Sequence, residues 1–259
     1  MTKKEIFASH NIEYKAGKIK APIFGFISPL LIDGNSKLGK GVYTFSILAG
    51  NKTENVTIDG QNFDVAGTCP CNCPGCYAQK NRYAFGTVKE ANARKTVLAR
   101  LYPDFVQRAI VAQIKADKVK TCRIHASGDF FSTDYIALWR NVIKACPDCT
   151  FWTYTKLAEA ESAFDDLANA NVVKSIIPGI GYNFGHCDYI IDTFNKLQEM
   201  GKSVYICRCG IDKNQHCTNC KGCSKNDFVI FVEHSTGYIA ESDPLYKDIV
   251  KLVESQKQF

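Results

Sequence analysis

The pattern of apolar and polar positions divides the chain after residue 120 into short strand segments and amphipathic helix segments. Runs rich in β-branched and aromatic residues alternate with segments whose apolar positions recur every three to four residues. The expected strands span 120–127, 150–156, 172–178 and 202–208, and the expected helices between them span 132–146, 158–170 and 188–200. Strands that alternate with helices in this way are typical of βαβ units, so the pattern predicts a parallel sheet.

The first part of the chain has a different pattern. Residues 1–40 are interrupted by Pro and Gly and predict short extended pieces. Segments 42–50 and 55–60 resemble the two strands of a hairpin. Two helix-forming segments follow at 87–101 and 103–116, and the second of them opens with a proline.

These elements predict a single α/β domain over residues 1–259, since a chain of this length can bury a core without covalent staples. We expect an incomplete barrel or a parallel sheet of βα units with a cysteine-rich C-terminal segment. In this scheme residues 1–66 form an irregular N-terminal segment (lead-in) with the N-terminal strands, and residues 67–80 form a cysteine loop. The cysteine-rich segment 207–227 would fold over the rim of the sheet.

Composition adds one strong feature, which is the 13 cysteines. Nine of them lie within 69–76 and 207–223, and such close spacing gathers thiols around one centre instead of closing disulfide loops. No segment has the apolar core of a signal peptide or the roughly 18 apolar residues of a membrane span. We therefore expect a cytoplasmic protein with reduced thiols and no membrane partner.

The net charge of +6 does not indicate a particular partner, because the 32 basic residues are dispersed among 26 acidic and many apolar ones. A nucleic-acid surface usually shows a denser basic stripe, so a nucleic-acid partner is not expected. The expected partners are a small-molecule substrate or an electron donor.

The first cysteine run contains Cys69, Cys73 and Cys76 in the spacing C-x3-C-x2-C. Three thiolates placed in this way can bind three irons of a 4Fe-4S cluster and leave the fourth iron open to another ligand. Cys71 lies within the same run, so a different selection of ligands is also open.

The second run has the ferredoxin-like spacing C-x2-C-x2-C and a remote fourth cysteine. Its candidate ligands are Cys217, Cys220 and Cys223, together with Cys207 or with Cys209 in its place. Zinc is the alternative metal, because C-x2-C pairs also build tetrahedral structural sites. The spacing leaves open whether the two runs bind one cluster or two.

Polar residues follow the expected strands at their carboxyl ends, where parallel sheets collect ligand-binding loops. His125, Ser127 and Asp129 alternate after one strand, and Lys156 ends the next. One hypothesis makes Ser127 an ester-hydrolysing nucleophile near the Asp129 carboxylate, with His125 or His186 as base, and makes Lys156 an acid or an ion-pair partner. The alternative is that Ser127 and Asp129 form a turn, cap the following helix or bind a ligand's polar groups.

The cysteine spacing and the βα succession resemble the radical S-adenosylmethionine superfamily, in which three cysteines bind a 4Fe-4S cluster on a partial α/β barrel. In that superfamily a glycine-rich acidic turn holds the amino group of the cofactor. The resemblance places Ser127, Gly128 and Asp129 in that turn. Gly75 departs from it, because the superfamily usually has an aromatic residue just before the third cysteine.

The chain also resembles a family of phage-encoded iron-sulfur proteins of poorly defined role. The shared motifs are a cysteine loop ending in "CYA", "HASGDFFS", "FWTYTK", "CTNCKGC" and "VIFVEH", over roughly residues 65 to 235. This resemblance implies an iron-sulfur protein of phage or prophage origin in the cytoplasm of an infected or lysogenic host cell.

Three functional hypotheses therefore remain. The first is a radical-SAM-like enzyme with one or two 4Fe-4S clusters and bound S-adenosylmethionine. The second is an iron-sulfur-containing ester hydrolase that uses Ser127. The third is a non-catalytic cluster or zinc protein with a redox-sensing or docking role.

Overall fold

A five-stranded sheet forms the centre of the molecule. The computed structural model describes residues 1–34, 38–71, 73, 76–79, 81–177, 179–212, 215–232 and 243–256. The sheet has the order β10-β9-β8-β5-β4, with bounds Ala170–Lys174, Thr150–Thr155, Thr121–Ile124, Val42–Phe45 and Ile32–Asp33. The strands β5, β8, β9 and β10 are parallel neighbours in chain order, and β4 is antiparallel at the edge. Their carboxyl ends therefore lie along one edge of the sheet.

A second parallel sheet continues this layer beyond β10. Its order is β13-β15-β14, with bounds Phe184–Gly185, Phe228–Val232 and Val204–Ile206. The backbone N–H of Asn183, next to β13, donates to the carbonyl of Ser175, next to β10, at 3.2 Å. The pairings within the described ranges leave β4 and β14 as edges, so the strands form an open sheet and no closed barrel.

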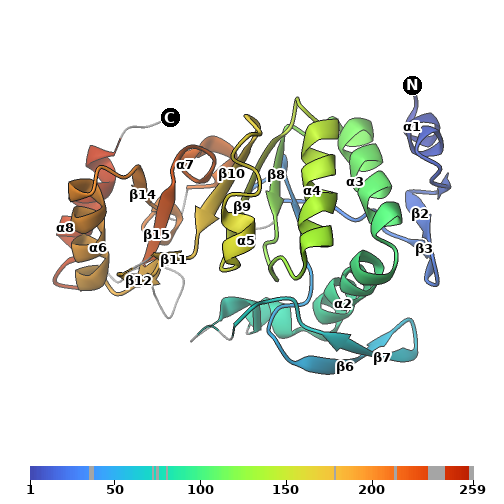
Figure 1. Ribbon diagram of the computed structural model, residues 1–259, viewed down its shortest axis with the longest axis horizontal. Coiled ribbons are helices and arrows are strands. Elements are labelled where there is room, and N and C mark those ends of the chain that lie inside the picture. Colours follow the sequence, from blue (N-terminus) through green and yellow to red (C-terminus); the bar gives the residue numbers. More distant parts are fainter. Residues whose placement is uncertain are drawn as a thin grey trace.

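The part of the chain that the structure describes contains eight α-helices. They are α1 Lys3–Ser9, α2 Gly86–Leu101, α3 Pro103–Asp117, α4 Thr133–Ala145, α5 Ala158–Glu161, α6 Cys187–Glu199, α7 Gly222–Lys225 and α8 Tyr246–Ser255. Helices α3 and α4 lie side by side over the central sheet, and α6 and α8 lie together beside β14 and β15 (Figure 1). The mixed α/β class predicted from the sequence is confirmed.

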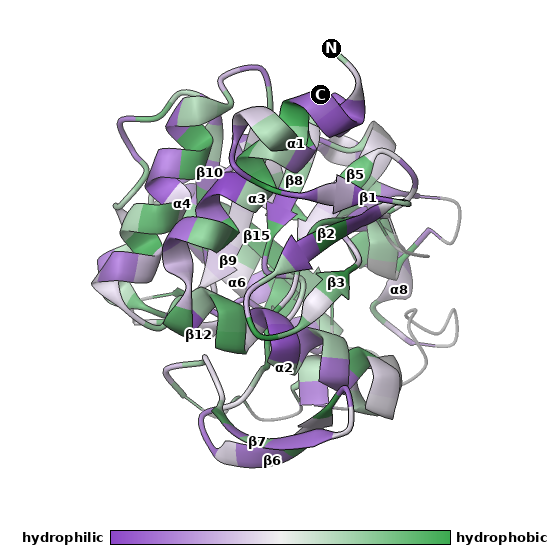
Figure 2. Cartoon of the chain, turned by 90° about the vertical axis from the view of Figure 1, so that its right-hand side faces the viewer, coloured by the Kyte–Doolittle hydropathy of each residue, from purple (hydrophilic) through white to green (hydrophobic). Residues whose placement is uncertain are grey.

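The remaining elements are short. They are the sheet β1 Tyr14–Lys15, β2 Lys18–Ala21 and β3 Gly25–Ile27, the hairpin β6 Thr53–Ile58 and β7 Gln61–Ala66, the pair β11 Ile176–Ile177 and β12 Gly181–Tyr182, and the 3-10 turns η1 Tyr77–Gln79, η2 Asn81–Ala84, η3 Arg208–Gly210 and η4 Cys217–Asn219. The hairpin lies outside α2, which separates it from the rest of the molecule (Figure 2). A small apolar cluster with members Val56, Ile58 and Val97 joins the hairpin to α2.

The two faces of the central sheet are covered differently. Along β9, Phe151 belongs to the large apolar core under α3 and α4. The next residue, Trp152, points to the opposite face, because side chains alternate along a strand. There Trp152 packs with Leu38, Val42 and cysteines of the segment that contains η3, η4 and α7. We call this second side the inner face.

Two sequence predictions differ from the structure in detail. Segments 42–50 and 55–60 do not pair as a hairpin, because β5 pairs with β8 and β6 pairs with β7. The predicted helix 158–170 is helical only over Ala158–Glu161. Just beyond that helix, Arg140 of α4 donates to the carbonyl of Ala163, a tertiary contact that periodicity cannot anticipate. The domain boundaries drawn from the sequence stay a prediction.

Candidate functional site

The carboxyl ends of β5, β8 and β9 come together as the parallel topology requires. The backbone N–H of Ile47, after β5, donates to the carbonyl of Ser127, after β8, at 3.0 Å. The Ser127 hydroxyl donates to the Ile47 carbonyl, also at 3.0 Å. Gly128 follows with φ +84°, and a Cβ there would lie 2.5 Å from Ile47 Cγ1 and 2.7 Å from Thr68 Oγ1. Only glycine fits this turn, which packs directly against the start of the cysteine loop.

Asp129 joins this turn to the end of β9. Its Oδ1 accepts from the Phe130 N–H at 2.8 Å and from the Thr155 hydroxyl at 2.7 Å. Its Oδ2 accepts from the Lys156 N–H at 2.9 Å. The side chain is buried, and burial raises the pKa of Asp129 although these three donors favour its charged form. Asp129 is therefore a buried acceptor that fixes where Lys156 leaves the sheet.

The first cysteine group consists of Cys69, Cys71, Cys73 and Cys76. Cys69 is anchored to the segment after β5, since its N–H donates to the Gly50 carbonyl at 2.8 Å and its Sγ accepts from the Gly50 N–H at 3.3 Å. The Cys76 N–H donates to the Cys73 carbonyl at 3.3 Å, which holds the backbones of these two cysteines together. The loop thus lies at the carboxyl edge of the sheet.

Lys156 brings a positive charge to this cysteine group. Its side chain is hydrogen-bonded to Cys73 and interacts with Asp129 and Cys69. Burial alone would lower the pKa of Lys156, but the neighbouring Cys73 and Asp129 outweigh burial, and the pKa is raised. Burial raises the pKa of Cys69 to about 12, against the opposing effect of the Gly50 N–H. A metal that binds here has to displace thiol protons.

His125 lies beneath the site and does not contact Ser127 in the hydrogen bonds of the described residues. Its Nε2 lies 2.8 Å from the Tyr135 hydroxyl, and its ring packs against Phe130 and Trp139. Burial, and then the charge of Arg123, lower the pKa of His125 to about 3, so the imidazole is neutral. Its φ of +60° is unusual for a residue with a side chain, so the backbone is strained at His125, just before the turn that contains Ser127.

The second cysteine group consists of Cys207, Cys209, Cys217, Cys220 and Cys223, and it lies on the inner face of the sheet. Cys209 is hydrogen-bonded to Cys207 and to Cys217. Cys223 interacts electrostatically with Cys207, Cys217 and Cys220. The five thiols therefore gather in one place although they span 17 positions of the sequence.

Two tyrosines contact this second group. The Tyr154 hydroxyl, from β9, donates to Cys223 Sγ at 2.6 Å. The Tyr205 hydroxyl, from β14, lies 3.4 Å from Cys220 Sγ. The segment is also tied to β10, since Asn171 Nδ2 donates to the Cys223 carbonyl at 2.7 Å. Sequence spacing identified the cysteines but gave no signal for these tyrosine contacts.

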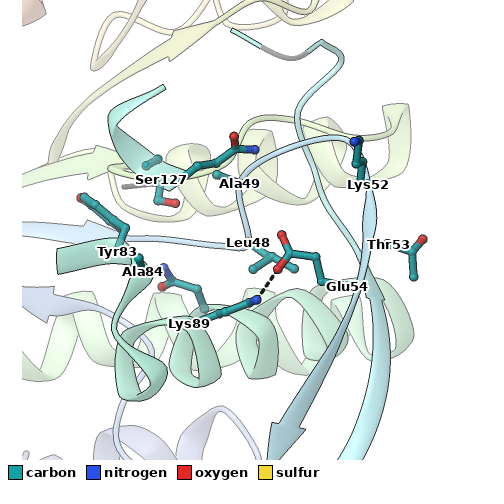
Figure 3. Close-up of a pocket in the computed structure, with 12 residues that line it drawn as sticks. Leu48, Ala49, Lys52, Thr53, Glu54, Tyr83, Ala84, Lys89 and Ser127 are labelled. Carbon is teal, nitrogen blue, oxygen red and sulfur yellow. Dashed lines mark ion pairs between the residues drawn. The ribbon is translucent and has the colours of Figure 1, made fainter. Parts of the chain in front are cut away.

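A cavity of about 450 Å³ lies beside the first cysteine group. Its walls come from residues 48–54, from η1 and η2, from α2, and from Ser127. Lys89 of α2 forms an ion pair with Glu54 of β6 on one side of the cavity, and Ser127 lies on the opposite side (Figure 3). Polar and charged groups line a space that opens next to the cysteine loop.

The donors around the cysteines are of the kind that stabilises thiolate ligands of a metal. Gly50 N–H, Lys156 and the Tyr154 hydroxyl all donate to cysteine sulfur, and such hydrogen bonds stabilise thiolate ligands. Within the described ranges, no three His, Cys, Asp or Glu side chains converge as a site for a single metal ion.

The sequence-predicted site residues thus fall into two sets, with His125 apart from both. The first set lies at the carboxyl edge and comprises Cys69, Cys73, Cys76, Ser127, Gly128, Asp129 and Lys156. The second set lies on the inner face and comprises Cys207, Cys217, Cys220 and Cys223. His125 is buried below the first set, and Glu233 and His234 of the last sequence motif lie outside the described residues. Cys122, Cys146 and Cys149 are buried near the amino ends of β8 and β9.

The fold and the site define a mixed α/β protein with an open parallel sheet and two cysteine groups at its carboxyl edge and inner face. The family described as Gene product 88 matches residues 29–226, and the chain belongs to this family. No solved structure matches the chain.

Two curated relatives are phage proteins. The Gene 88 protein of Mycobacterium phage L5 is 40% identical over 60 residues, which are 20% of this chain and 25% of that protein. The Gene 88 protein of Mycobacterium phage D29 is 33% identical over 114 residues, which are 39% of this chain and 46% of that protein. The chain therefore spans less than half the length of these relatives.

These matches confirm the predicted phage-encoded family, and its iron-sulfur character stays a prediction. Among the described residues, no helix has the length and apolar character needed to cross a membrane.

Proposed function

We propose that the protein binds a 4Fe-4S cluster through Cys69, Cys73 and Cys76 and acts as a radical-SAM-like enzyme on a small-molecule substrate. The observation that carries the proposal is the meeting of the first cysteine group with Asp129 and Lys156 at the carboxyl edge of a parallel sheet. A cluster with one iron open to S-adenosylmethionine supplies one-electron chemistry at this edge.

The residues around the cluster site have separable tasks. Lys156 donates to Cys73 and places a cation beside the thiolates. Asp129 fixes the backbone of Lys156 through its Oδ2. Ser127 and Gly128 form the turn after β8, which packs against Ile47 beyond β5 and against Thr68 at the start of the cysteine loop, and Ser127 also lines the cavity. We assign that cavity to S-adenosylmethionine or the substrate, since it has both polar and apolar walls, adjoins the cysteine loop and has a suitable size.

The ester-hydrolase alternative has weaker geometric support. The Ser127 hydroxyl donates to a backbone carbonyl, and His125 Nε2 is paired with Tyr135. Asp129 is saturated by backbone and threonine donors. A nucleophile and its base need a mutual hydrogen bond, and the described residues show none between Ser127 and His125.

The test is anaerobic purification of the full chain, followed by iron, sulfide and zinc analysis. Electron paramagnetic resonance (EPR) spectra of the reduced protein are then recorded with and without S-adenosylmethionine. We expect bound iron with sulfide, a spectrum altered by S-adenosylmethionine, and formation of 5'-deoxyadenosine. The variant Cys73→Ala should lose the altered spectrum, whereas the matched variant Cys71→Ala, in the same loop, should keep it.

Other outcomes favour the remaining hypotheses. Bound iron whose EPR spectrum is unchanged by S-adenosylmethionine, together with no formation of 5'-deoxyadenosine, would favour a redox sensor or docking protein. Turnover of an activated ester without reductant would favour the hydrolase. Zinc without iron would refute the cluster proposal.

A further inference from the structure

The two cysteine groups approach each other at the end of one strand. Tyr154 of β9 donates to Cys223 in the second group at 2.6 Å. Lys156, two residues farther along, is hydrogen-bonded to Cys73 in the first group. Side chains two positions apart in extended chain point to the same side, and their Cα atoms are about 6.6 Å apart. The end of β9 is thus in direct contact with both groups.

The second group contains enough cysteines to supply a ligand set of its own. Cys223 faces Cys207, Cys217 and Cys220, which gives four thiols without any contribution from residues 69–76. These cysteines pack with Val173 and Val229 on the inner face, whereas the first group lies at the edge. Two separate sets of thiols argue against one cluster shared between the two runs.

We infer that the second cysteine group binds its own iron-sulfur cluster and that this cluster relays electrons to the first, with Tyr154 as its positioning residue. The inference rests on the proposed function for the first group. A one-electron carrier protein of the iron-sulfur or flavin type reduces the second cluster by one electron, and that cluster passes the electron to the first. No bond is made or broken in this transfer, and no proton moves.

Tyr154 tunes the second cluster through its hydrogen bond. A donor to a ligating sulfur stabilises the reduced state, which carries more negative charge, and so raises the reduction potential. The guanidinium carbon of Arg123 lies 5.0 Å from the centroid of the Tyr154 ring, which adds a cation beside the same tyrosine. The tyrosine ring also packs edge-on against Phe231 of β15, with centroids 5.4 Å apart, so its hydroxyl is held toward Cys223.

The experiment measures iron per chain and the reduction potentials of both clusters by EPR-monitored titration of the full chain. Wild-type protein should hold about eight irons, and Cys223→Ala should hold about four and keep the signal of the first cluster. Cys220→Ala is a second variant for the same test. Tyr154→Phe should keep all the iron and lower the potential of one signal only. The matched control Tyr189→Phe removes a hydrogen bond to the Tyr182 carbonyl and should leave both potentials unchanged.

The outcomes separate this inference from the function on which it rests. About four irons in wild type, retained in Cys223→Ala and Cys220→Ala, would refute the second cluster and leave the proposed function standing. Loss of all iron in both variants would show one shared cluster and also overturn the inference. Unchanged potentials in Tyr154→Phe would refute the role of the tyrosine. Absence of iron from every form would refute the proposed function itself.

Discussion

Lys95 is a lysine of α2 that is only 6% exposed. Its Nζ lies 5.4 Å from the centroid of the Phe45 ring, under the central sheet. Burial lowers the pKa of Lys95 from 10.5 to about 8. The shift means that the folded state disfavours the charged lysine by about 3 kcal/mol at neutral pH, because each pKa unit corresponds to about 1.4 kcal/mol.

Replacing Lys95 by Met should therefore stabilise the protein at pH 7. Met keeps the apolar stem of the lysine and removes the buried charge. Loss of the cation-π contact with Phe45 reduces the resulting stabilisation by about 1 kcal/mol. The expected net gain is about 2 kcal/mol. It is largest below pH 8, where Lys95 is protonated in both the folded and unfolded states. It shrinks by about 2 kcal/mol by pH 9.5, where the folded state has lost the proton and the unfolded chain has not.

The assay is urea unfolding of the metal-free, reduced protein at pH 7 and pH 9.5, followed by tryptophan fluorescence. Lys196→Met, on the exposed side of α6, is the control and should change the free energy of unfolding by less than about 0.5 kcal/mol at either pH. Destabilisation by Lys95→Met, or an equal gain at both pH values, would show that burial of an unpaired charge is the wrong account of this residue.

The remaining predictions concern the turn after β8. Gly128→Ala should lower the free energy of unfolding by more than about 2 kcal/mol because its methyl group collides with the cysteine loop. Gly60→Ala, with a similar φ of +81° and open space around the new methyl, should lose only about 1 kcal/mol in the same urea titration. Asp129→Asn turns an amide N–H₂ toward the Lys156 N–H and should lose about 1–3 kcal/mol, with a perturbed EPR spectrum of the first cluster. Ser127→Ala should lose about 1 kcal/mol and keep the cluster absorbance, and abolished ester turnover in this variant would instead support the hydrolase.

The site at the carboxyl edge could be predicted because a simple rule governs it. Parallel strands place their carboxyl ends together, so Ser127 and Lys156 had to lie near each other once β8 and β9 were recognised. The cysteine loop follows the β6–β7 hairpin and is anchored at Gly50 beyond the end of β5, which joins the same sheet, although the sequence suggested a different partner for β5. The rule needs only the order of strands and not the exact pairing of each one.

The inner face could not be predicted from the same pattern. Strands of a parallel sheet are apolar on both sides, so the periodicity of β9 does not say which side meets helices and which side meets the cysteine segment. The contact between Tyr154 and Cys223 joins residues 69 positions apart and leaves no local signal. The early end of α5 was equally hard to predict from local sequence. Just beyond it, the Ala163 carbonyl accepts a hydrogen bond from Arg140 of α4, which is distant in the chain.

The cysteine segment on the inner face has a consequence for the order in which the protein is assembled. Uncharged thiols behave as small apolar side chains, and here they pack with Val173, Val229 and Trp152 as part of the core. The cysteine segment is therefore packed as part of the core on the inner face. If the protein binds clusters as we propose, this packing predicts that a newly made chain folds first and receives its clusters afterwards, so that the supply of iron changes the cluster content more than the folded fraction.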